Sequence, residues 1–330
     1  MLKTLFALVF LAALCAGGYA AWYASTPVEV KQLPATLDLP AGTRFRSVVQ
    51  RLEEAGIAVR SLEFEVLARS LGRDQSIKAG SYELAAAPTP LELLDKLTRG
   101  DVTLDEVRFI EGWNFRQVRA ALGASKSLKH ETVALDDTQL LARLGATETH
   151  PEGLFFADTY LFAKGSSDLR VLRRAYQAMQ RHLAREWQAR DQSVPYASAY
   201  QALIMASIVE KETGRAEDRD TIAGVLVNRL RKGMLLQVDP TVIYGLGEKF
   251  DGNLKKIHLL TDGPYNTYTR AGLPPTPIAA TGLASLRAAL RPAKTDAYYY
   301  VARGDGTSQF SRTLEEHNRA VRKYQLNAGR

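Results

Sequence analysis

The sequence PYASAYQALIMASIVEKE, residues 195–212, is mostly apolar or small up to Val209 and ends in three charged residues. Proline is well tolerated at the start of a helix, and no helix breaker follows Pro195 within this stretch. The sequence therefore predicts a helix over residues 195–212 whose side chains are largely buried. We assign this helix to a mixed α+β domain that spans residues 126–330.

The last turn of this predicted helix carries two acidic residues, Glu210 and Glu212. At 100° per residue, Glu212 is turned by about 200° from Glu210, so the two carboxyl groups cannot form a facing pair. Glu210 shares its face with small and apolar residues, namely Ala199, Leu203, Ala206 and Ser207. A carboxyl group on such a face is a candidate general acid and base, although a glutamate that merely ends a helix in solvent needs no function.

Polar and aromatic loops follow this helix. They contain five candidates for lining a site, namely Gln237, Asp239, Tyr244, Asn266 and Tyr268. Amides and hydroxyls can hydrogen-bond to sugars while tyrosine rings cover sugar faces, so such loops suit carbohydrate recognition. The same residue types also form ordinary turns, and turn formation is the more frequent reason for them.

An aromatic block, residues 151–162, precedes a helix that we expect over residues 169–192. Its rings could stack on sugars, but core packing is the commoner role. The five histidines are scattered, and none has a zinc-type spacing to another histidine or to Cys15, so we expect neither a metal nor another cofactor. His317 could reach a site or cap a helix, and we favour the structural role.

The N-terminus carries an uncharged, apolar run over residues 4–25, preceded by Lys3. Such a run is long enough to span a bilayer once, which takes roughly 20 residues. Trp22 and Tyr23 end the run as interfacial aromatics do, and Lys3 favours a cytoplasmic N-terminus. We expect residues 1–25 to be a membrane anchor; a signal peptide cleaved near Ala20 is the alternative.

Residues 26–125 alternate strand-like and helix-like segments. We expect strands at residues 36–39 and within 77–84, and helices at 45–55, 62–71 and 89–98. Residues 42–52 and 112–122 share glycine, phenylalanine, arginine, valine and leucine in register. The shared pattern predicts two strand–turn–helix modules, either duplicated or independently arrived at.

The composition limits the class of partner. The 330 residues carry a formal net charge of +7, which favours binding to an anionic partner such as a phospholipid surface, an acidic wall polymer or nucleic acid. The basic residues are dispersed along amphipathic helices and are not interleaved with aromatics. We therefore expect no nucleic-acid binding.

Several strings together resemble the endolytic murein transglycosylase family, also called MltG or YceG-like. They are ASIVEKET at 206–213, NRL at 228–230, QVDPTVIYG at 237–245, YNTY at 265–268, GLPPTPI at 272–278 and GLFFADTY at 153–160. Their order and spacing match the family over nearly the whole chain. Thr276 stands where the family commonly has glycine, and Ala157 replaces a commoner proline, but neither change removes a reactive group.

The resemblance implies an N-terminal transmembrane helix, a small LysM-like α+β region over 26–125 and a mixed α+β catalytic domain over 126–330. It implies that Glu210 is the catalytic residue. Our own candidates for binding the substrate are Gln237, Asp239, Tyr244, Asn266 and Tyr268. The expected location is the inner membrane, with the catalytic domain in the periplasm. The expected partners are peptidoglycan glycan strands, the membrane and peptidoglycan synthases.

The implied reaction cuts the MurNAc–GlcNAc bond within strands without water and leaves 1,6-anhydro ends, which would release or terminate nascent strands. Two other functions stay open. One is a hydrolytic muramidase with Asp239 as the second carboxylate, and the other is a non-catalytic peptidoglycan-binding scaffold. The LysM-like region could bind glycan or serve only as a spacer.

Overall fold

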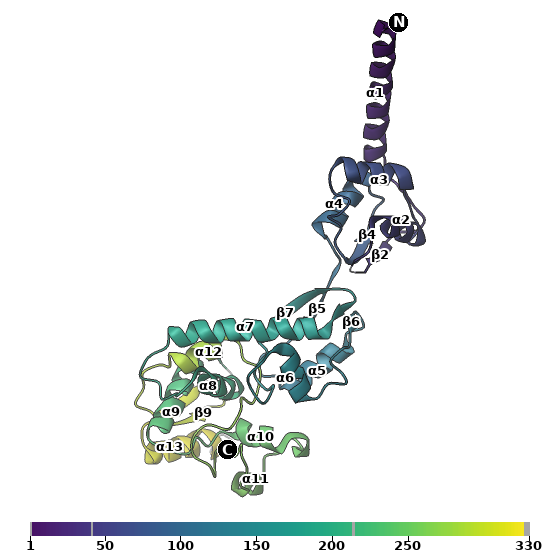
Figure 1. Ribbon diagram of the computed structural model, residues 1–330. Helices are drawn as coiled ribbons and strands as arrows, with labels where there is room; N and C mark the ends of the chain where they lie inside the picture. Colours follow the sequence, from purple (N-terminus) through teal and green to yellow (C-terminus); the bar gives the residue numbers. More distant parts are fainter. Residues whose placement is uncertain (1, 41, 213–214, 327–330) are drawn as a thin grey trace. The chain divides into compact units, whose positions relative to one another are not determined.

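The computed structural model describes residues 2–40, 42–212 and 215–326, and the chain forms two compact units (Figure 1). Unit 1 comprises Met1–Glu106 and Leu161–Ser166; unit 2 comprises Val107–Tyr160 and Ser167–Arg330. The mixed α+β class and the N-terminal apolar helix are confirmed. Residues 107–125 group with unit 2, whereas the sequence-based division placed them in the region before residue 126.

Unit 1 contains four helices and four short strands among its described residues. They are α1 (Leu2–Ser25), β1 (Glu29–Val30), β2 (Ala35–Leu39), α2 (Phe45–Glu54), β3 (Ile57–Ala58), α3 (Ser61–Ser70), β4 (Gly80–Leu84) and α4 (Pro90–Arg99). Strand β1 pairs with β3, and β2 pairs with β4, both antiparallel. The strands and helices that the sequence predicts here are confirmed to within about two residues.

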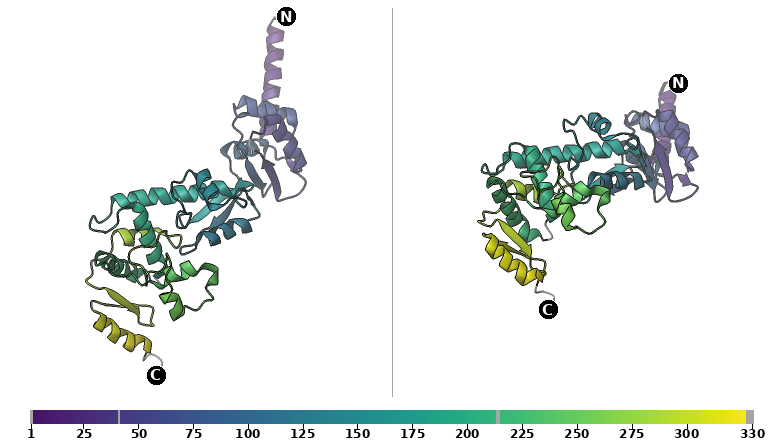
Figure 2. Two further views of the ribbon diagram at one scale, coloured as in Figure 1. Left: turned by 60° about the horizontal axis from the view of Figure 1, so that its bottom comes forward. Right: turned by 90° about the horizontal axis from the view of Figure 1, so that it is seen from below.

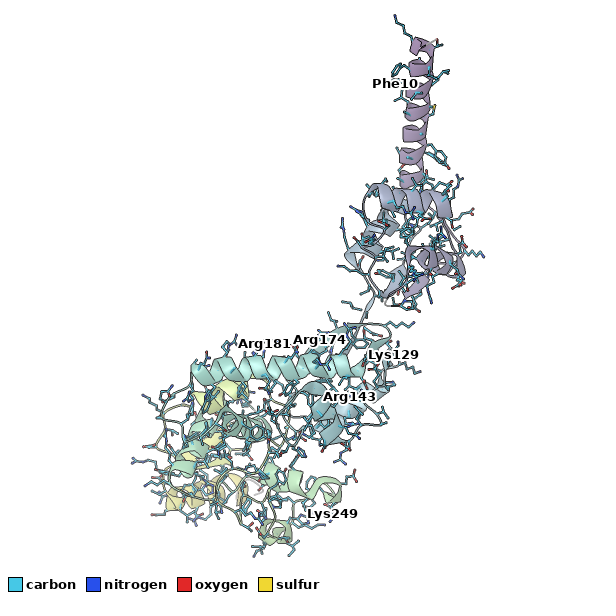
Figure 3. All side chains as sticks on the ribbon, in the orientation of Figure 1. Phe10, Lys129, Arg143, Arg174, Arg181 and Lys249 are labelled. Carbon is cyan, nitrogen blue, oxygen red and sulfur yellow. The ribbon has the colours of Figure 1, made fainter. Side chains whose placement is uncertain are left out.

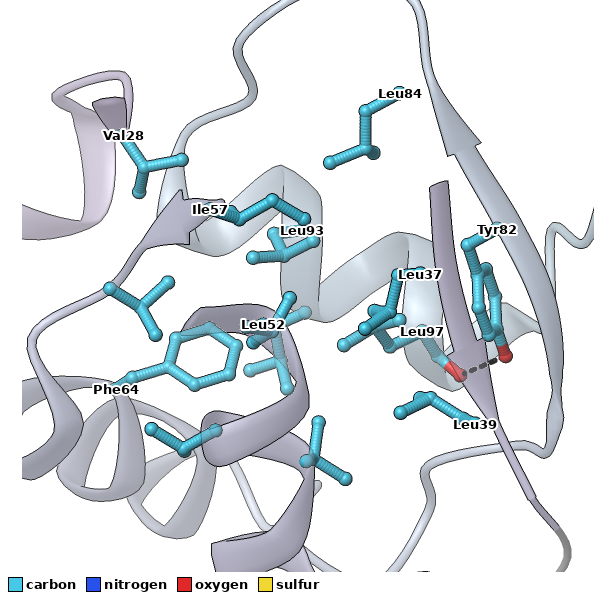
Figure 4. Close-up of a cluster of buried hydrophobic side chains, with 14 of the residues drawn as sticks. Val28, Leu37, Leu39, Leu52, Ile57, Phe64, Tyr82, Leu84, Leu93 and Leu97 are labelled. Atoms are coloured by element: carbon cyan, nitrogen blue, oxygen red, sulfur yellow. Dashed lines mark hydrogen bonds between the residues drawn. The ribbon is translucent and has the colours of Figure 1, made fainter. Parts of the chain in front are cut away.

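The core of unit 1 forms between the β2–β4 pair and helices α2 to α4 (Figure 4). Alternate residues of β2 are buried because successive side chains of a strand point to opposite faces. Leu52, Phe64 and Leu97 are fully buried in this core. The Tyr82 hydroxyl donates to the carbonyls of Lys78 and Leu97, so its polar end is satisfied inside the core.

Helix α1 is exposed along most of its length, as Phe10 shows (Figure 3). Within residues 3–25 an 18-residue window has a mean hydropathy of 2.0, so the helix is long and apolar enough to cross a bilayer. Its last turns pack on unit 1. Tyr23 is buried and donates to the Arg60 carbonyl, and the Tyr19 hydroxyl donates to Glu63.

The two modules predicted from the internal repeat share their local structure. Gly42 and Gly112 each have φ near +80°, and each glycine turn leads into a helix that begins at a phenylalanine. Glycine adopts this left-handed conformation without a steric penalty, which explains its place in both turns. The second module consists of β5 (Leu104–Arg108) followed by α5 (Phe115–Ala124).

Unit 2 is built around helices, and its long helix α7 is visible in every view (Figures 1 and 2). Its helices besides α5 are α6 (Asp137–Leu144), α7 (Asp168–Gln188), α8 (Ala199–Glu212), α9 (Arg219–Arg231), α10 (Asp239–Leu246), α11 (Lys256–Leu260), α12 (Leu283–Leu290) and α13 (Leu314–Val321). The strands that lie wholly in unit 2 are β6 (Leu128–Lys129), β9 (Tyr299–Ala302) and β10 (Ser308–Ser311). Like β5, strands β7 (Thr159–Ala163) and β8 (Ser166–Ser167) have residues in both units. Strand β5 pairs with β7, β6 with β8, and β9 with β10.

Helix α8 is the buried helix that the sequence predicts, but it begins at Ala199 and not at Pro195. The predicted start was wrong because Ser198 caps the helix: its hydroxyl accepts from the Gln201 amide at 3.3 Å. Every residue from Ala202 to Val209 is buried, and α8 packs against α7, α9 and α12. The aromatic block at 151–162 also lies largely in the core, where Leu154, Phe155 and Tyr160 are buried.

Candidate active site

The two glutamates at the end of α8 point to different surroundings. Glu210 Oε2 accepts from the Gly282 amide at 2.9 Å, whereas Glu212 Oε2 accepts from the Tyr300 hydroxyl at 2.8 Å. This divergence follows from their separation by two residues along a helix. The prediction that they do not form a facing pair is confirmed. Thr213, which ends the characteristic string, lies outside the described residues.

A cavity of about 540 Å³ lies beside Glu212. Its lining combines Glu212 with Gln237, Asp239 and Tyr268, three of the five residues that the sequence proposes for substrate contact. The other polar residues that line it are Arg229, Tyr300, Ser308, His317 and Gln325. The volume lies within the range of small-molecule sites, and convergent polar groups in such a cavity are typical of a binding or catalytic site.

Hydrogen bonds join the two loop segments that line this cavity. The Gln237 amide donates to the Thr267 carbonyl at 3.0 Å, and the Val238 amide donates to the Thr267 hydroxyl at 3.0 Å. The Tyr268 hydroxyl donates to Asp239. Gln237 has φ of +54°, a conformation that is uncommon for a residue with a side chain. The segments are thus fixed to each other by buried contacts around Thr267.

Asn266 occupies a different place from the other loop residues. It is 5% exposed, and its side-chain amide donates to the carbonyls of His258, Leu259 and Thr261. Its side-chain oxygen accepts from the Tyr268 amide at 2.9 Å. Because these bonds use the N–H donors of its side chain, Asn266 has none left for a substrate, and its role is to hold the loop that carries Tyr268.

The environment of Glu212 favours the protonated form of its carboxyl group. Burial raises its pKa because removal from water disfavours the charged form; the hydrogen bond from Tyr300 opposes this effect, and the Asp239 carboxylate adds to it. Burial also raises the pKa of Tyr300, so its hydroxyl remains a donor. A carboxyl group in these surroundings can donate a proton and then accept one.

Glu210 lies at the N-terminus of α12, beside a second acidic residue that the sequence analysis did not single out. A Cβ atom placed on Gly282 would lie 1.6 Å from Glu111 Oε1, so Glu111 also packs against Gly282. Burial and the nearby Glu210 raise the pKa of Glu111, and Arg219 opposes them. A carboxylate at Glu210 accepts the first free amide of α12 and complements its dipole. The hydrogen bond to Gly282 and the dipole of α12 therefore explain an acidic residue at position 210 without a catalytic role.

A second cavity, of about 960 Å³, lies among α5, α10 and the end of α8. Tyr244 lines it and donates to Glu152 at 3.0 Å, and the two carboxyl oxygens of Glu152 also accept from the Phe115 amide. Glu152 is 3% exposed, and burial raises its pKa to about 7 despite these hydrogen bonds. Tyr244 is thus placed apart from the other predicted substrate residues.

Glu152, Tyr300 and Arg229 line the two cavities but are not among the candidates predicted from the sequence. Glu152 could have been noticed as an acidic residue directly before a block that is otherwise apolar and aromatic. Glu111 could have been noticed as the acidic residue that directly precedes the glycine of the second repeat. Arg229 stands in the NRL string, but the sequence predicts no contact for Arg229 or Tyr300, because their role depends on contacts between segments far apart in the chain.

Comparison with known proteins identifies similar chains. The chain is 33% identical over 316 residues to an endolytic murein transglycosylase of Bacillus subtilis, covering 90% of this chain and 87% of the relative. An endolytic murein transglycosylase of Streptococcus pneumoniae is 27% identical, with 96% of this chain and 64% of the relative covered. The chain therefore spans less than two thirds of the pneumococcal relative.

A solved structure of a YceG-like protein from Listeria monocytogenes matches with a TM-score of 0.56 and 32% identity, covering 86% of this chain and 97% of that chain. The family model described as YceG-like matches residues 37–323. This match includes the whole lining of the larger cavity, the lining of the smaller one except Gln325, both glutamates at the end of α8 and all five loop residues predicted from the sequence. The chain belongs to the YceG-like family.

Proposed function

We propose that this protein is an endolytic murein transglycosylase that cuts peptidoglycan glycan strands, with Glu212 as its acid and base. The single observation that carries the proposal is the 540 Å³ cavity in which the half-buried Glu212 carboxyl meets Asp239 and Tyr268. Relatives at 27–33% identity over most of this chain are named for this activity. Their names favour an enzyme over a non-catalytic wall-binding scaffold.

The proposed reaction needs one carboxyl group in two successive roles. Glu212 first protonates the oxygen that leaves C1 of N-acetylmuramic acid, and the C1–oxygen bond breaks through an oxocarbenium-like state. The resulting Glu212 carboxylate then takes the proton from the muramoyl 6-hydroxyl as that oxygen bonds to C1. The carboxyl group is regenerated, no water is consumed, and the product ends in a 1,6-anhydro sugar.

The assignment of Glu210 from the sequence remains a prediction beside this proposal. Both glutamates stand in the characteristic string, and the resemblance assigns catalysis to the first of them, Glu210. The geometry favours Glu212 because it shares a cavity with three predicted substrate residues and because burial raises its pKa. Glu210 instead accepts from Gly282 at the start of α12.

The loop residues receive separate roles in the proposal. Gln237, Asp239 and Tyr268 contact the sugars beside Glu212, and Asn266 acts indirectly by holding the loop of Tyr268. Tyr244 contacts the strand in the neighbouring cavity. A hydrolytic muramidase is the second candidate, because Asp239 lies in the same cavity as Glu212 and could serve as the second carboxylate.

Analysis of products tests the reaction type. Incubation of the full chain in detergent with uncrosslinked glycan strands should give internal fragments that end in 1,6-anhydromuramic acid. Such ends are lighter than reducing ends by one water and resist borohydride, so mass spectrometry distinguishes them. Because the cut is internal, long strands should shorten to intermediate oligomers before disaccharides accumulate.

Hydrolysis would give the opposite pattern in the same experiment. Fragments with reducing muramic acid ends, carrying oxygen from isotopically labelled water, would reject transglycosylation and support Asp239 as a second carboxylate. If neither short nor long strands are cleaved, the result would support the alternative of a non-catalytic peptidoglycan-binding scaffold. Boiled enzyme provides the control for strand breakage during handling.

The proposed location is the inner membrane, with α1 as a single-pass anchor and the chain after residue 25 in the periplasm. The length and apolar surface of α1 support this location, as does the wall-directed activity in the names of the relatives. Residues 26–125 are proposed to form a LysM-like region that contacts glycan or spaces the enzyme from the membrane. Peptidoglycan synthases are proposed partners, since released strands must come from synthesis.

Removal of residues 1–18 should release the protein from membranes while unit 1 stays folded. The truncation keeps Tyr19 and Tyr23, which contact the rest of unit 1. Membrane sedimentation with alkaline extraction measures the release, and the full chain serves as the control. Isolation of a mature chain that begins after Ala20 from its native cell would show a cleaved signal and reject the anchor.

A further inference from the structure

The 960 Å³ cavity adjoins the cavity of Glu212 through two pairs of neighbouring residues. Lys211 lines the larger cavity and Glu212 the smaller one; likewise Pro240 lines the larger and Asp239 the smaller. The end of α8 and the start of α10 therefore separate two cavities that a single extended substrate could occupy. Both belong entirely to unit 2.

The lining of the larger cavity carries an excess of basic groups. Its basic residues are Arg116, Arg119, His150 and Lys211, and its acidic residues are Asp137 and Glu152. Because the pKa of Glu152 is raised to about 7, this carboxyl is partly neutral near pH 7. The remaining charges favour an anionic ligand.

Two of these basic side chains keep donors available for a ligand. The Lys211 ammonium donates to the Gly112 carbonyl at 3.2 Å, which uses one of its three donors. Arg116 pairs with Glu248, whose side chain is 82% exposed, so water screens that pair. Arg119 differs, since its guanidinium donates to the carbonyls of Thr132 and Leu135 and mainly holds the wall.

The remaining wall suits a chain of peptide groups more than a small inorganic anion. Phe115, Tyr244, Tyr265 and Ile278 contribute aromatic and apolar surface. The rings of Tyr244 and Tyr265 meet edge to face with centroids 4.9 Å apart. A mixed wall of this kind, with a few charged groups, is typical of sites that hold an extended organic ligand.

We infer that this cavity binds the acidic peptide stem of the muramic acid whose bond is cut, an inference that rests on the proposed function. The stem is attached through the lactyl group at C3 of the sugar whose C1 reacts at Glu212. It therefore leaves the strand close to the scissile bond, and its free carboxylates match Lys211 and Arg116. The enzyme thus distinguishes strands that carry stems from denuded strands.

Kinetics on two matched substrates test this inference. The probes are uncrosslinked glycan strands with intact stems and the same strands after an amidase has removed the stems. The measured quantity is the ratio of kcat/KM for the two substrates in full-length protein. We expect a ratio above one, which falls by about three- to tenfold in Lys211→Gln and in Arg116→Gln, because each loses a charged contact to the stem.

The ratio separates this inference from the proposed function. Cleavage of denuded strands with an unchanged ratio in both variants, or with no preference in the wild type, would overturn the stem site while the transglycosylase proposal stands. Arg181→Gln on α7 is the matched control, since it removes one positive charge from the exposed surface of unit 2 (Figure 3). Lys211→Arg keeps the charge and should retain the preference.

Discussion

Replacement of Glu212 by glutamine should lower strand cleavage by about three orders of magnitude, the range expected when a positioned acid and base is lost. The amide keeps the size of the side chain, and its oxygen can still accept from Tyr300. It cannot donate the proton to the leaving oxygen or take one from the 6-hydroxyl. The measurement is the initial rate of fragment formation, with circular dichroism to show that the fold is kept.

Glu210→Gln is the matched control for this prediction, because it makes the same change two residues earlier on α8. Its amide oxygen can still accept from Gly282, so α12 should keep its position. The lost charge at the start of α12 should cost about 0.3–1 kcal/mol of stability, and most of the activity should remain. If Glu210→Gln were inactive and Glu212→Gln active, the assignment from the sequence would be correct and ours would be rejected.

Local patterns predicted most of the secondary structure. The Gly-x-x-Phe turns at Gly42 and Gly112 precede α2 and α5. Both the left-handed conformation of glycine and the amphipathic spacing of a helix depend only on residues close in sequence, so the sequence predicts these elements well. The start of α8 was misplaced because proline tolerance was considered and the nearby cap at Ser198 was not. Helix ends depend on such single hydrogen bonds, so a periodic pattern locates them less well than it locates helices.

The site was predicted less completely than the fold, since its chemistry depends on distant segments. The sequence placed Glu212 away from Glu210 correctly, but it gave no indication of what Glu212 would face. Its partner Tyr300 is 88 residues further along the chain. Desolvation by such partners sets which carboxyl favours its protonated form, and helical periodicity contains no information about it.

The characteristic strings acquire a physical meaning once these contacts are known. Thr267 in the YNTY string bonds to Gln237 and Val238 in the preceding string, and Asn266 fixes the loop through its amide. Some residues of each string thus hold the others in place. Arg229 in the NRL string has a similar function, because it donates to the carbonyls of Tyr298 and Leu236 beside the same cavity.

Arg229→Met should lower the free energy of unfolding by about 3–5 kcal/mol, because several buried carbonyl groups lose their donor. Arg229 is 7% exposed; its Nε donates to the Tyr298 carbonyl at 2.6 Å and its Nη1 to the Leu236 carbonyl at 2.8 Å. Its guanidinium also lies 5.1 Å from the centre of the Tyr299 ring. Urea unfolding followed by circular dichroism measures the effect.

The same change should also reduce activity in the molecules that remain folded. Arg229 links α9 to β9 and to the segment before Asp239, and the Glu212 cavity lies between these elements. Arg231→Met provides the control, since Arg231 is on the same helix but is exposed and donates only to Ser193 among the described residues. Arg231→Met should lower the free energy of unfolding by no more than about 1 kcal/mol. Equal destabilisation by both substitutions would show that the buried carbonyls find other donors, and Arg229 would then not be the residue that holds this wall of the site.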